Sequence, residues 1–344
     1  MRYDQLGRSG LNVSKLALGT MVFGWKTPAD EAFRIVDRAL DEGINLIDTS
    51  NSYGRGRSEE IVGEALARNR RRNAVILATK FHHRMDENDV NSSGNGRRNV
   101  IHSCEASLRR LGTDRIDLYQ VHRPQSSVPI DETLRALDDL RRAGKIVYAG
   151  TSNFAAWELV DAHWAARAGR TIAFVSEQGP YNLLDRSIEL EILPAATQFG
   201  IGVIAFSPLA EGILSGKYRR GQELPPDSRY AKVDKPGMYR ERLTAPVFDV
   251  VEGLERLAQR RATSISAFAL AWLASRPGLS SIIVGPSTER QLIDNLNFLG
   301  MTLTDEEYIA IDTLAPRGSV VSPYRIMVTQ GRADGDRAAF KGSR

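Results

Sequence analysis

The chain has 344 residues, of which 42% are hydrophobic and 26% are charged, and its formal net charge is +4. This composition is typical of a folded globular protein and excludes a disordered or collagen-like chain. No apolar run reaches the ~20 residues of a membrane-spanning helix, and residues 1–10 lack the apolar segment of a signal peptide. Because Cys104 is the only cysteine, no disulfide can form within the chain, and we expect a cytoplasmic protein without a membrane partner.

The densest basic segment is RNRRRN at residues 68–73. Basic runs occur in nucleic-acid sites, and they also occur at the C-terminal ends of helices, where positive charge is favourable. No aromatic residue interrupts this run, and no nucleic-acid-binding motif accompanies it. We therefore interpret the run as a solvated helix end and expect no nucleic-acid partner.

Short aliphatic and β-branched runs alternate along the chain with amphipathic helical patterns. The runs are almost continuously apolar, as strands of a parallel sheet covered by helices are. The predicted strands span residues 15–20, 45–50, 74–80, 116–122, 146–153, 173–178, 202–209 and 280–285.

Helix signals separate these strands. Thr27 and Pro28 predict a helix start, with the Thr27 hydroxyl as the cap and Pro28 at the first helical position. Gly112 and Gly144 predict the ends of two later helices. Each helix returns the chain for another parallel strand. The repeated unit predicts an α/β fold, a (β/α)8 TIM barrel, as a single domain over residues 1–344.

The alternative is a doubly wound open sheet, whose first strand usually leads into a glycine-rich phosphate turn. Here the first strand leads into GTMVFGWKTPADEAF, and the GIGVIA segment at 200–205 leads into a strand rather than out of one. We therefore favour the barrel. The long segment 210–243 after the seventh strand predicts a lid or binding loop, and residues 317–344 form a polar C-terminal tail.

Ionisable residues stand where several predicted strands end, which in a barrel is the end that carries the chemistry. Asp48 lies at the end of the second strand, and Tyr53 lies in the loop that follows. Lys80 closes the third strand and His122 the fourth. Each residue alone has an ordinary explanation as a turn, solvated or packed residue. Their convergence on one rim favours a shared site.

These side chains suit one kind of chemistry. A tyrosine with a pKa of about 10 is a weak acid at neutral pH. A Lys80 ammonium would lower the pKa of Tyr53, and the Asp48 carboxylate would keep Lys80 charged. His122 would hydrogen-bond a carbonyl oxygen. The set suits protonation of that oxygen while a cofactor delivers hydride to the carbon, because no side chain donates hydride.

At these residues the sequence resembles the aldo-keto reductase superfamily, and the resemblance covers nearly the whole chain. The matching segments are GINLIDTSNSYG, SEEIVGEAL, ATKF, IDLYQVHRP, GTSNF, EQGPYNLLDR, FSPLAEGILSGKY and VGPSTERQLIDN. The resemblance implies a catalytic tetrad of Asp48, Tyr53, Lys80 and His122, with Tyr53 as the proton donor. It implies an NAD(P)H-dependent oxidoreductase that reduces an aldehyde or ketone to an alcohol.

The same resemblance implies a site for NADPH or NADP+. Ser152, Asn153 and Gln178 would bind the nicotinamide carboxamide, whereas Tyr181 fits stacking on the ring and plain packing equally well. Residues 207–209 with Lys217 and Arg229 would hold the pyrophosphate, and residues 285–295 the adenosine. The implied cofactor residues are Thr20, Met21, Ser152, Asn153, Gln178, Tyr181, Phe206, Ser207, Pro208, Leu209, Lys217, Arg229, Gly285, Ser287, Gln291, Asp294 and Asn295.

Two departures from the family pattern concern the adenosine segment. Many relatives carry a basic residue where Thr288 stands, and the nearest cation here is Arg290. The family's glutamate is Asp294, which is one methylene shorter. Pairing of the 2′-phosphate is thereby weakened, but NADPH stays favoured over NADH.

Trp25 and His82 are predicted to line the substrate pocket. The adjacent His82 and His83 do not predict a metal site, because no cysteine or carboxylate framework surrounds them. The predicted partner is a small-molecule carbonyl compound, and the sequence carries no signal for its identity or for the oligomeric state.

Two alternatives within the resemblance stay open. The potassium-channel β subunits are also similar to this sequence, which allows a nucleotide-binding regulatory role, and reduction of a keto-deoxysugar intermediate is a narrower form of the enzyme hypothesis. A barrel glycosidase is disfavoured, because it needs two carboxylates flanking the bond and the rim offers a lysine and a tyrosine instead.

Overall fold

The computed structural model describes residues 1–68, 70–226, 228–231 and 242–324. Residues 232–241 of the predicted loop and 325–344 of the predicted tail therefore lie outside the described residues. The chain divides into two compact units. Unit 1 comprises Met1–Gly179, Ile192–Phe206 and Pro277–Leu296, and unit 2 comprises Pro180–Glu191, Ser207–Arg276 and Asn297–Arg344. The expectation of a single domain stays a prediction.

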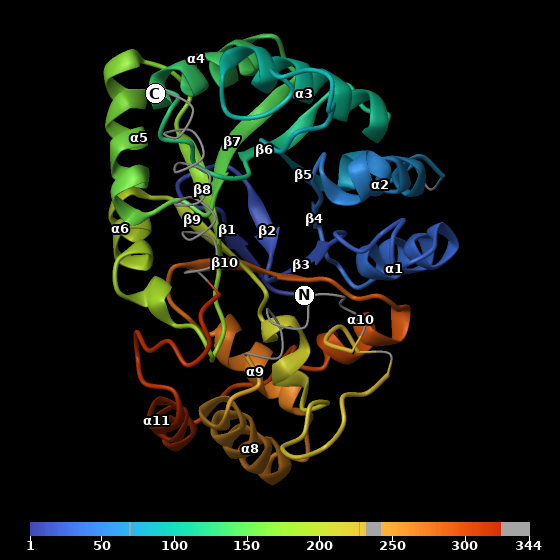
Figure 1. Ribbon diagram of the computed structural model, residues 1–344, viewed down its shortest axis with the longest axis vertical. Coiled ribbons are helices and arrows are strands. Elements are labelled where there is room, and N and C mark those ends of the chain that lie inside the picture. The colour runs from blue at the N-terminus through green and yellow to red at the C-terminus, as the bar shows by residue number, and fades with distance from the viewer. Residues whose placement is uncertain (69, 227, 232–241, 325–344) are drawn as a thin grey trace. The chain divides into compact units, whose positions relative to one another are not determined.

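Unit 1 is built on a closed barrel of eight parallel strands in the order β10-β3-β4-β5-β6-β7-β8-β9 (Figure 1). Every strand expected from the apolar runs is present, so the predicted (β/α)8 barrel is confirmed. The strands are β3 (Leu16–Gly19), β4 (Leu46–Asp48), β5 (Ile76–Phe81), β6 (Ile116–Val121), β7 (Ile146–Ser152), β8 (Phe174–Pro180), β9 (Gly202–Phe206) and β10 (Leu279–Val284).

Helices α1 to α6 lie outside the strands of the barrel (Figure 1). The predicted stop signals are confirmed: Gly112 follows α3 with a left-handed φ of 59°, and Gly144 lies just beyond α4 with a φ of 72°. The helices of unit 1 are α1 (Ala29–Asp41), α2 (Arg57–Arg68), α3 (Arg97–Leu111), α4 (Ile130–Arg142), α5 (Ala156–Gly169), α6 (Ile192–Phe199) and α10 (Glu289–Leu296).

The predicted cap of α1 is wrong. Pro28 itself takes the N-cap position, and no side chain caps the first turn. The Thr27 hydroxyl instead donates to the backbone carbonyl of Ser287 at 3.1 Å. Thr27 thus ties the loop before α1 to the loop before α10, a contact between distant parts of the chain that the local pattern could not indicate.

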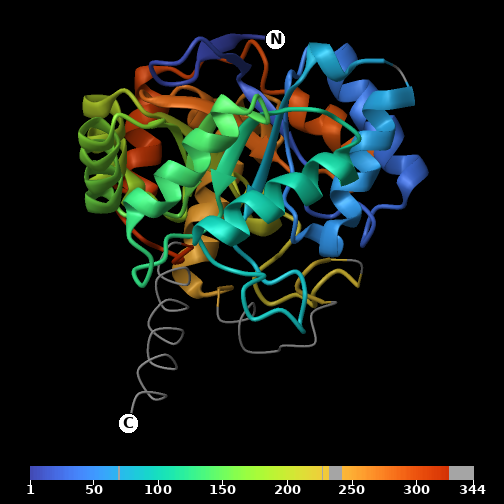
Figure 2. The same ribbon diagram turned by 90° about the horizontal axis from the view of Figure 1, so that it is seen from above.

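An antiparallel hairpin, β1 (Tyr3–Gln5) and β2 (Asn12–Ser14), precedes the barrel and was not predicted. Leu6 and Val13 of this hairpin belong to one buried apolar cluster with inward residues of the barrel strands. The Ser281 hydroxyl at the start of β10 donates to the Ser14 carbonyl at 2.7 Å. Figure 2 shows the hairpin, in dark blue, at one end of the barrel. It closes the amino end, which leaves the carboxyl end for polar side chains.

Unit 2 contains α8 (Ala245–Arg260), α9 (Ile265–Ala274) and α11 (Asp305–Leu314). Its interior holds a buried cation, because the Arg186 guanidinium pairs with Glu189 at 2.7 Å and lies over the Trp272 ring. Thr304 and Glu307 form a capping box at the start of α11. Within the described part of the chain, no helix combines the length and the apolar character that a membrane span requires.

The contact between α2 and α3 gives a test of this packing. A Cβ atom on Gly63 would lie 2.5 Å from the backbone carbonyl oxygen of Leu111. We expect Gly63→Ala to lower the free energy of unfolding by about 1–3 kcal/mol in a urea titration, because the two backbones must separate. Gly169→Ala is the control, since its Cβ would meet Thr171 at an ordinary 3.6 Å. Equal stability of the two variants would contradict the close approach.

Candidate active site

Neighbouring barrel strands bring the predicted residues to one end of unit 1. Asp48 is the last residue of β4, Lys80 the second-last of β5, and His122 directly follows β6. Lys80 is in register with Gln120 of β6, and the His122 backbone N–H donates to the carbonyl of Phe81 at 3.0 Å. Because parallel strands end on the same side, these side chains share the carboxyl end of the barrel.

The Lys80 ammonium is the centre of the site. Its Nζ donates to Asp48 Oδ2 at 2.5 Å, to the Thr49 carbonyl at 2.9 Å and to the Tyr53 hydroxyl at 3.3 Å. The Lys80 side chain is fully buried, and that of Asp48 is 4% exposed. Three acceptors satisfy the three ammonium protons. The structure therefore brings Asp48, Lys80 and Tyr53 into direct contact.

A tight turn presents Tyr53. The turn η1 (Tyr53–Gly56) follows β4, and the Tyr53 backbone N–H donates to the Ser50 carbonyl at 3.2 Å. Gly54 and Arg55 have left-handed φ angles of 56° and 55°, so the chain reverses sharply before α2. Arg55 adopts this conformation without the freedom of a glycine, which makes η1 a strained segment.

A buried set of hydroxyl groups holds this turn. The Ser58 hydroxyl donates to the Thr20 carbonyl at 2.8 Å and lies 3.0 Å from the Thr49 hydroxyl. The Thr20 hydroxyl donates to the backbone carbonyl of Asp48 at 3.1 Å. Thr20, an implied cofactor residue, thus uses its hydroxyl to hold the end of β4, and its contact with a cofactor stays a prediction.

Burial and neighbouring charges together set the protonation states of Lys80 and Tyr53. For Lys80, burial is the largest single effect and disfavours the ammonium. The charge of Asp48, the charge of Tyr53 and the hydrogen bonds to both groups together outweigh it, so the pKa of Lys80 is raised. For Tyr53, burial raises the pKa above its usual value, although the Lys80 charge acts to lower it. The Lys80 charge therefore acts on the pKa of Tyr53 in the expected direction, but the effect of burial is larger. The phenol keeps its proton at neutral pH.

His122 stands beside Tyr53. The two rings meet edge to face with centroids 5.9 Å apart, and His122 Nδ1 lies 3.1 Å from the Ser50 hydroxyl oxygen. Burial lowers the pKa of His122 well below its usual value, and the Lys80 charge lowers it further. The imidazole is therefore neutral at neutral pH and has one N–H donor and one acceptor nitrogen.

Two glutamine amides complete the environment of Asp48. Oδ1 of Asp48 accepts hydrogen bonds from Gln178 Nε2 at 2.8 Å and from Gln120 Nε2 at 3.1 Å. Gln178 Nε2 also donates to Gln120 Oε1 at 3.2 Å. Sequence reasoning missed Gln120. The available signal was a polar residue two positions before His122, at the register shared with Lys80.

The histidine nearest the tetrad is His83 rather than His82. The His83 ring meets His122 with centroids 4.7 Å apart, whereas His82 Nδ1 lies 2.9 Å from Asn95 Oδ1 in the loop after β5. Burial lowers the pKa of His83 to about 4. Trp25 is 74% exposed. The pocket-lining roles of Trp25 and His82 stay predictions, and His83 joins the residues near the chemistry.

The residues implied for the carboxamide lie next to His122. The Ser152 hydroxyl donates to the Gln178 carbonyl at 2.9 Å, and Asn153 Nδ2 donates to the His122 carbonyl at 3.1 Å. Gln178 Oε1 accepts no hydrogen bond from any residue that the structure describes. A carboxamide needs both donors and acceptors, so this group of hydroxyl and amide side chains fits it chemically.

The implied adenosine segment forms the loop before α10. The Ser287 backbone N–H donates to Gln291 Oε1 at 2.7 Å, which links the loop to the helix. The Glu289 backbone N–H donates to Glu31 Oε1 of α1 at 2.8 Å. The Glu31 carboxylate thus already accepts a hydrogen bond from the Glu289 backbone N–H at the start of α10. Asp294 is exposed, and Asn295 is half-buried on the same helix.

The implied pyrophosphate residues and Tyr181 belong to unit 2. Tyr181 is fully buried, with its ring centroid 5.6 Å from that of Trp272 and its hydroxyl donating to Glu189 at 2.6 Å. Arg229 lies 3.8 Å from the Glu211 carboxylate. Packing accounts for Tyr181 in this unit, and the cofactor roles stay predictions. The remaining implied residues here are Ser207, Pro208, Leu209 and Lys217.

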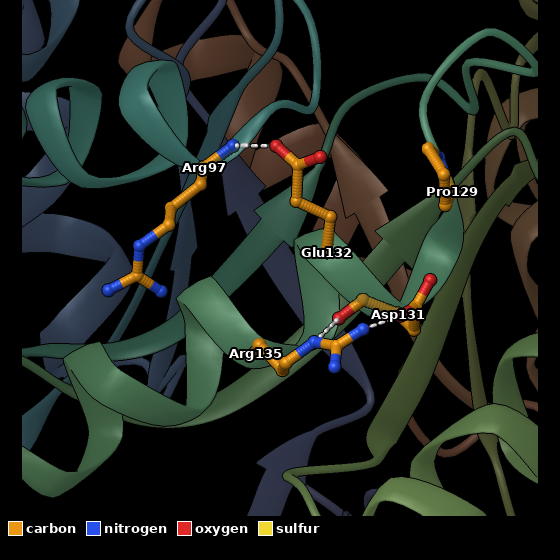
Figure 3. Close-up of a pocket in the computed structure, with 5 residues that line it drawn as sticks. All are labelled: Arg97, Pro129, Asp131, Glu132 and Arg135. Carbon is orange, nitrogen blue, oxygen red and sulfur yellow. Dashed lines mark hydrogen bonds and ion pairs between the residues drawn. The ribbon is translucent and has the colours of Figure 1, made fainter.

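A hollow lies apart from the tetrad, between the starts of α3 and α4 (Figure 3). Its charged groups are already paired: the Arg97 backbone N–H donates to Glu132 at 2.8 Å, and Arg135 pairs with Asp131. None of the predicted site residues lines it. Over the described ranges, no group of three or more metal-binding side chains is gathered.

Comparisons with known proteins identify the family. The sequence model of the aldo/keto reductase family matches residues 15–316. The chain belongs to the aldo/keto reductase family. Members of this family use nicotinamide cofactors, and the protein is an NAD(P)H-dependent oxidoreductase.

Two kinds of relative are similar over most of the chain. An uncharacterized oxidoreductase of Bacillus subtilis, YrpG, is 39% identical and covers 92% of this chain and 96% of its own length. A probable voltage-gated potassium channel subunit beta of Arabidopsis thaliana is 36% identical, over 86% of this chain and 90% of its own length. A similarly described protein of rice is 35% identical, over 87% and 91%.

The lowered pKa of His83 predicts acid sensitivity. Between pH 6.5 and 4 the unfolded chain protonates this histidine while the folded protein keeps it neutral, so stability falls as pH falls. The expected loss of unfolding free energy is about 3 kcal/mol, because a difference of one unit between the folded and unfolded pKa corresponds to ~1.4 kcal/mol. We expect His83→Asn to flatten the pH dependence of the unfolding free energy in urea titrations. His102→Asn is the control, and an unchanged slope in His83→Asn would contradict the prediction.

Proposed function

We propose that this protein reduces an aldehyde or ketone to an alcohol with NADPH, and that its partner is a small-molecule carbonyl compound. The observation that carries the proposal is the buried Lys80 ammonium, which contacts both Asp48 and the Tyr53 hydroxyl. A lysine paired with one carboxylate alone would be a structural ion pair. The added contact with a protonated phenol is what an acid catalyst needs.

In this proposal Tyr53 donates its proton to the carbonyl oxygen. Its raised pKa keeps the proton in place until the oxygen becomes basic, and Lys80 stabilises the phenolate that remains. Asp48 keeps the lysine charged and in position. Neutral His122, whose ring lies beside Tyr53, donates a second hydrogen bond to the same oxygen.

The chain's own residues would hold the cofactor as follows. Ser152, Asn153 and Gln178 bind the carboxamide, and Gln178 uses its Oε1 because both Nε2 protons are engaged by Asp48 and Gln120. The loop before α10 and the first turn of α10 bind the adenosine. When bound, the reduced nicotinamide supplies hydride to the carbonyl carbon.

A second candidate is a regulatory subunit that binds the cofactor without needing turnover. It is favoured by the identity of 36% to a plant protein described as a probable channel subunit beta. The intact Asp48, Tyr53, Lys80 and His122 arrangement favours the enzyme. Measurement of turnover with a panel of aldehydes and ketones separates the two candidates.

Removal of the proposed acid tests the assignment. We expect Tyr53→Phe to lower kcat at least about 100-fold, the scale of general acid catalysis, while cofactor affinity changes little. Stopped-flow turnover and cofactor fluorescence measure the two effects. Tyr148→Phe is the control, because among the described residues its hydroxyl accepts a hydrogen bond only from the Gly10 backbone N–H, at 3.3 Å. Full activity in Tyr53→Phe would refute the proton-donor role.

Cofactor choice depends on charge near the start of α10. Arg290 is the proposed partner of the 2′-phosphate, and the Glu31 carboxylate at the Glu289 amide opposes a phosphate nearby. We expect NADPH to bind more tightly than NADH, and Glu31→Gln to raise this preference about fivefold, the scale of one ~1 kcal/mol surface charge interaction.

Fluorescence titration with both cofactors measures this preference. Glu42→Gln, which removes the Arg38 partner at the end of the same helix, should leave it unchanged. An unchanged preference in Glu31→Gln would count against the role of Glu31. Absence of binding by either cofactor would overturn the proposed function itself.

A further inference from the structure

His122 can act on a carbonyl oxygen only from the ring nitrogen that carries its proton. A neutral imidazole has one N–H and one bare nitrogen, and the hydrogen bond made by one nitrogen decides which tautomer is present. Nδ1 of His122 lies 3.1 Å from the Ser50 hydroxyl. The Ser50 hydroxyl is thus the partner of Nδ1, and the direction of this hydrogen bond determines whether Nε2 carries the proton.

Ser50 has few ways to use its single proton. It is fully buried, and its oxygen already accepts a hydrogen bond from the Ser52 backbone N–H at 3.3 Å. The Ser52 hydroxyl lies 3.0 Å from it. Two arrangements remain for the side chains. Either the Ser52 hydroxyl donates to Ser50 and Ser50 donates to Nδ1, or Nδ1 donates to Ser50 and Ser50 donates to the Ser52 hydroxyl.

The two directions have opposite consequences for the site. If Ser50 donates to Nδ1, Nε2 carries the proton and offers a hydrogen bond to a substrate oxygen. If Nδ1 donates to Ser50, Nε2 is bare and cannot donate to a substrate oxygen. It would instead be an acceptor in the same site as the protonated Tyr53. Only the first direction gives a carbonyl oxygen two donors.

We propose that Ser50 is a positioning residue that donates to Nδ1 of His122 and thereby fixes the Nε2–H tautomer, with Ser52 donating to Ser50. This inference rests on the proposed function for its purpose, but the tautomer itself is a property of the free protein. The neutral state of the ring, which burial enforces, is what makes a tautomer choice necessary.

The test reads the tautomer directly. The chain has only five histidines, so long-range 1H–15N correlation spectra of protein labelled at histidine can resolve them, and a His122→Asn spectrum assigns the signal. At pH 7.5 we expect the wild-type protein to show His122 with a protonated Nε2 and a bare Nδ1. A wild-type spectrum with a protonated Nδ1 would overturn the proposal without any variant.

Variants then separate control of the tautomer from simple support of the loop. We expect Ser50→Ala to mix the two tautomers and to lower kcat about tenfold, the scale of one lost hydrogen bond, while the Kd of NADPH is unchanged. Ser50→Thr retains the hydroxyl and should retain the wild-type pattern. Ser103→Ala removes another buried hydroxyl, in α3, and should leave the His122 signal unchanged.

The outcomes are distinguishable. An unchanged tautomer in Ser50→Ala would refute the role of Ser50, whatever the activity. The expected tautomer pattern together with no turnover of any carbonyl compound would retain the role of Ser50 and refute the proposed function.

Discussion

The buried ion pair between Lys80 and Asp48 is the interaction on which the site depends. An unpaired charge in this position would be costly, and removal of one partner of a buried pair typically costs about 3–5 kcal/mol. The surroundings satisfy both partners. Lys80 finds three acceptors, and Asp48 receives the lysine on one oxygen and two glutamine amides on the other. Both charges of the pair are therefore satisfied, and one of the three acceptors of Lys80 is the phenol that we propose as the acid.

Burial has opposite effects on the acid and on the imidazole of the site, and both effects suit proton donation. The phenol of Tyr53 is kept protonated, and the ring of His122 is kept neutral. The barrel makes this environment possible, because the hairpin residues Leu6 and Val13 fill its amino end with apolar side chains. The polar groups then gather at the carboxyl end, where the strands lead into loops.

The relatives differ in description, although an oxidoreductase and a channel subunit have similar identities to this chain, 39% and 36%. A barrel of this family can therefore be described as an enzyme or as a subunit of a larger assembly. The contact of Lys80 with Tyr53 bears on this difference more directly than overall similarity does, because the proposed reduction depends on it.

The sequence by itself determined the barrel, since apolar runs and helix signals act locally and repeat with a regular period. It also indicated Asp48, Tyr53, Lys80 and His122 as one group, because parallel strands end on the same side. It could not indicate the packing of the hairpin against the amino end of the barrel or the hydrogen bond from Thr27 to Ser287, because these contacts join residues that are distant in the chain. Only the tertiary structure decided these contacts. It also decided that burial outweighs the Lys80 charge in the pKa of Tyr53, because burial depends on every element packed around a group and not on its neighbours in sequence.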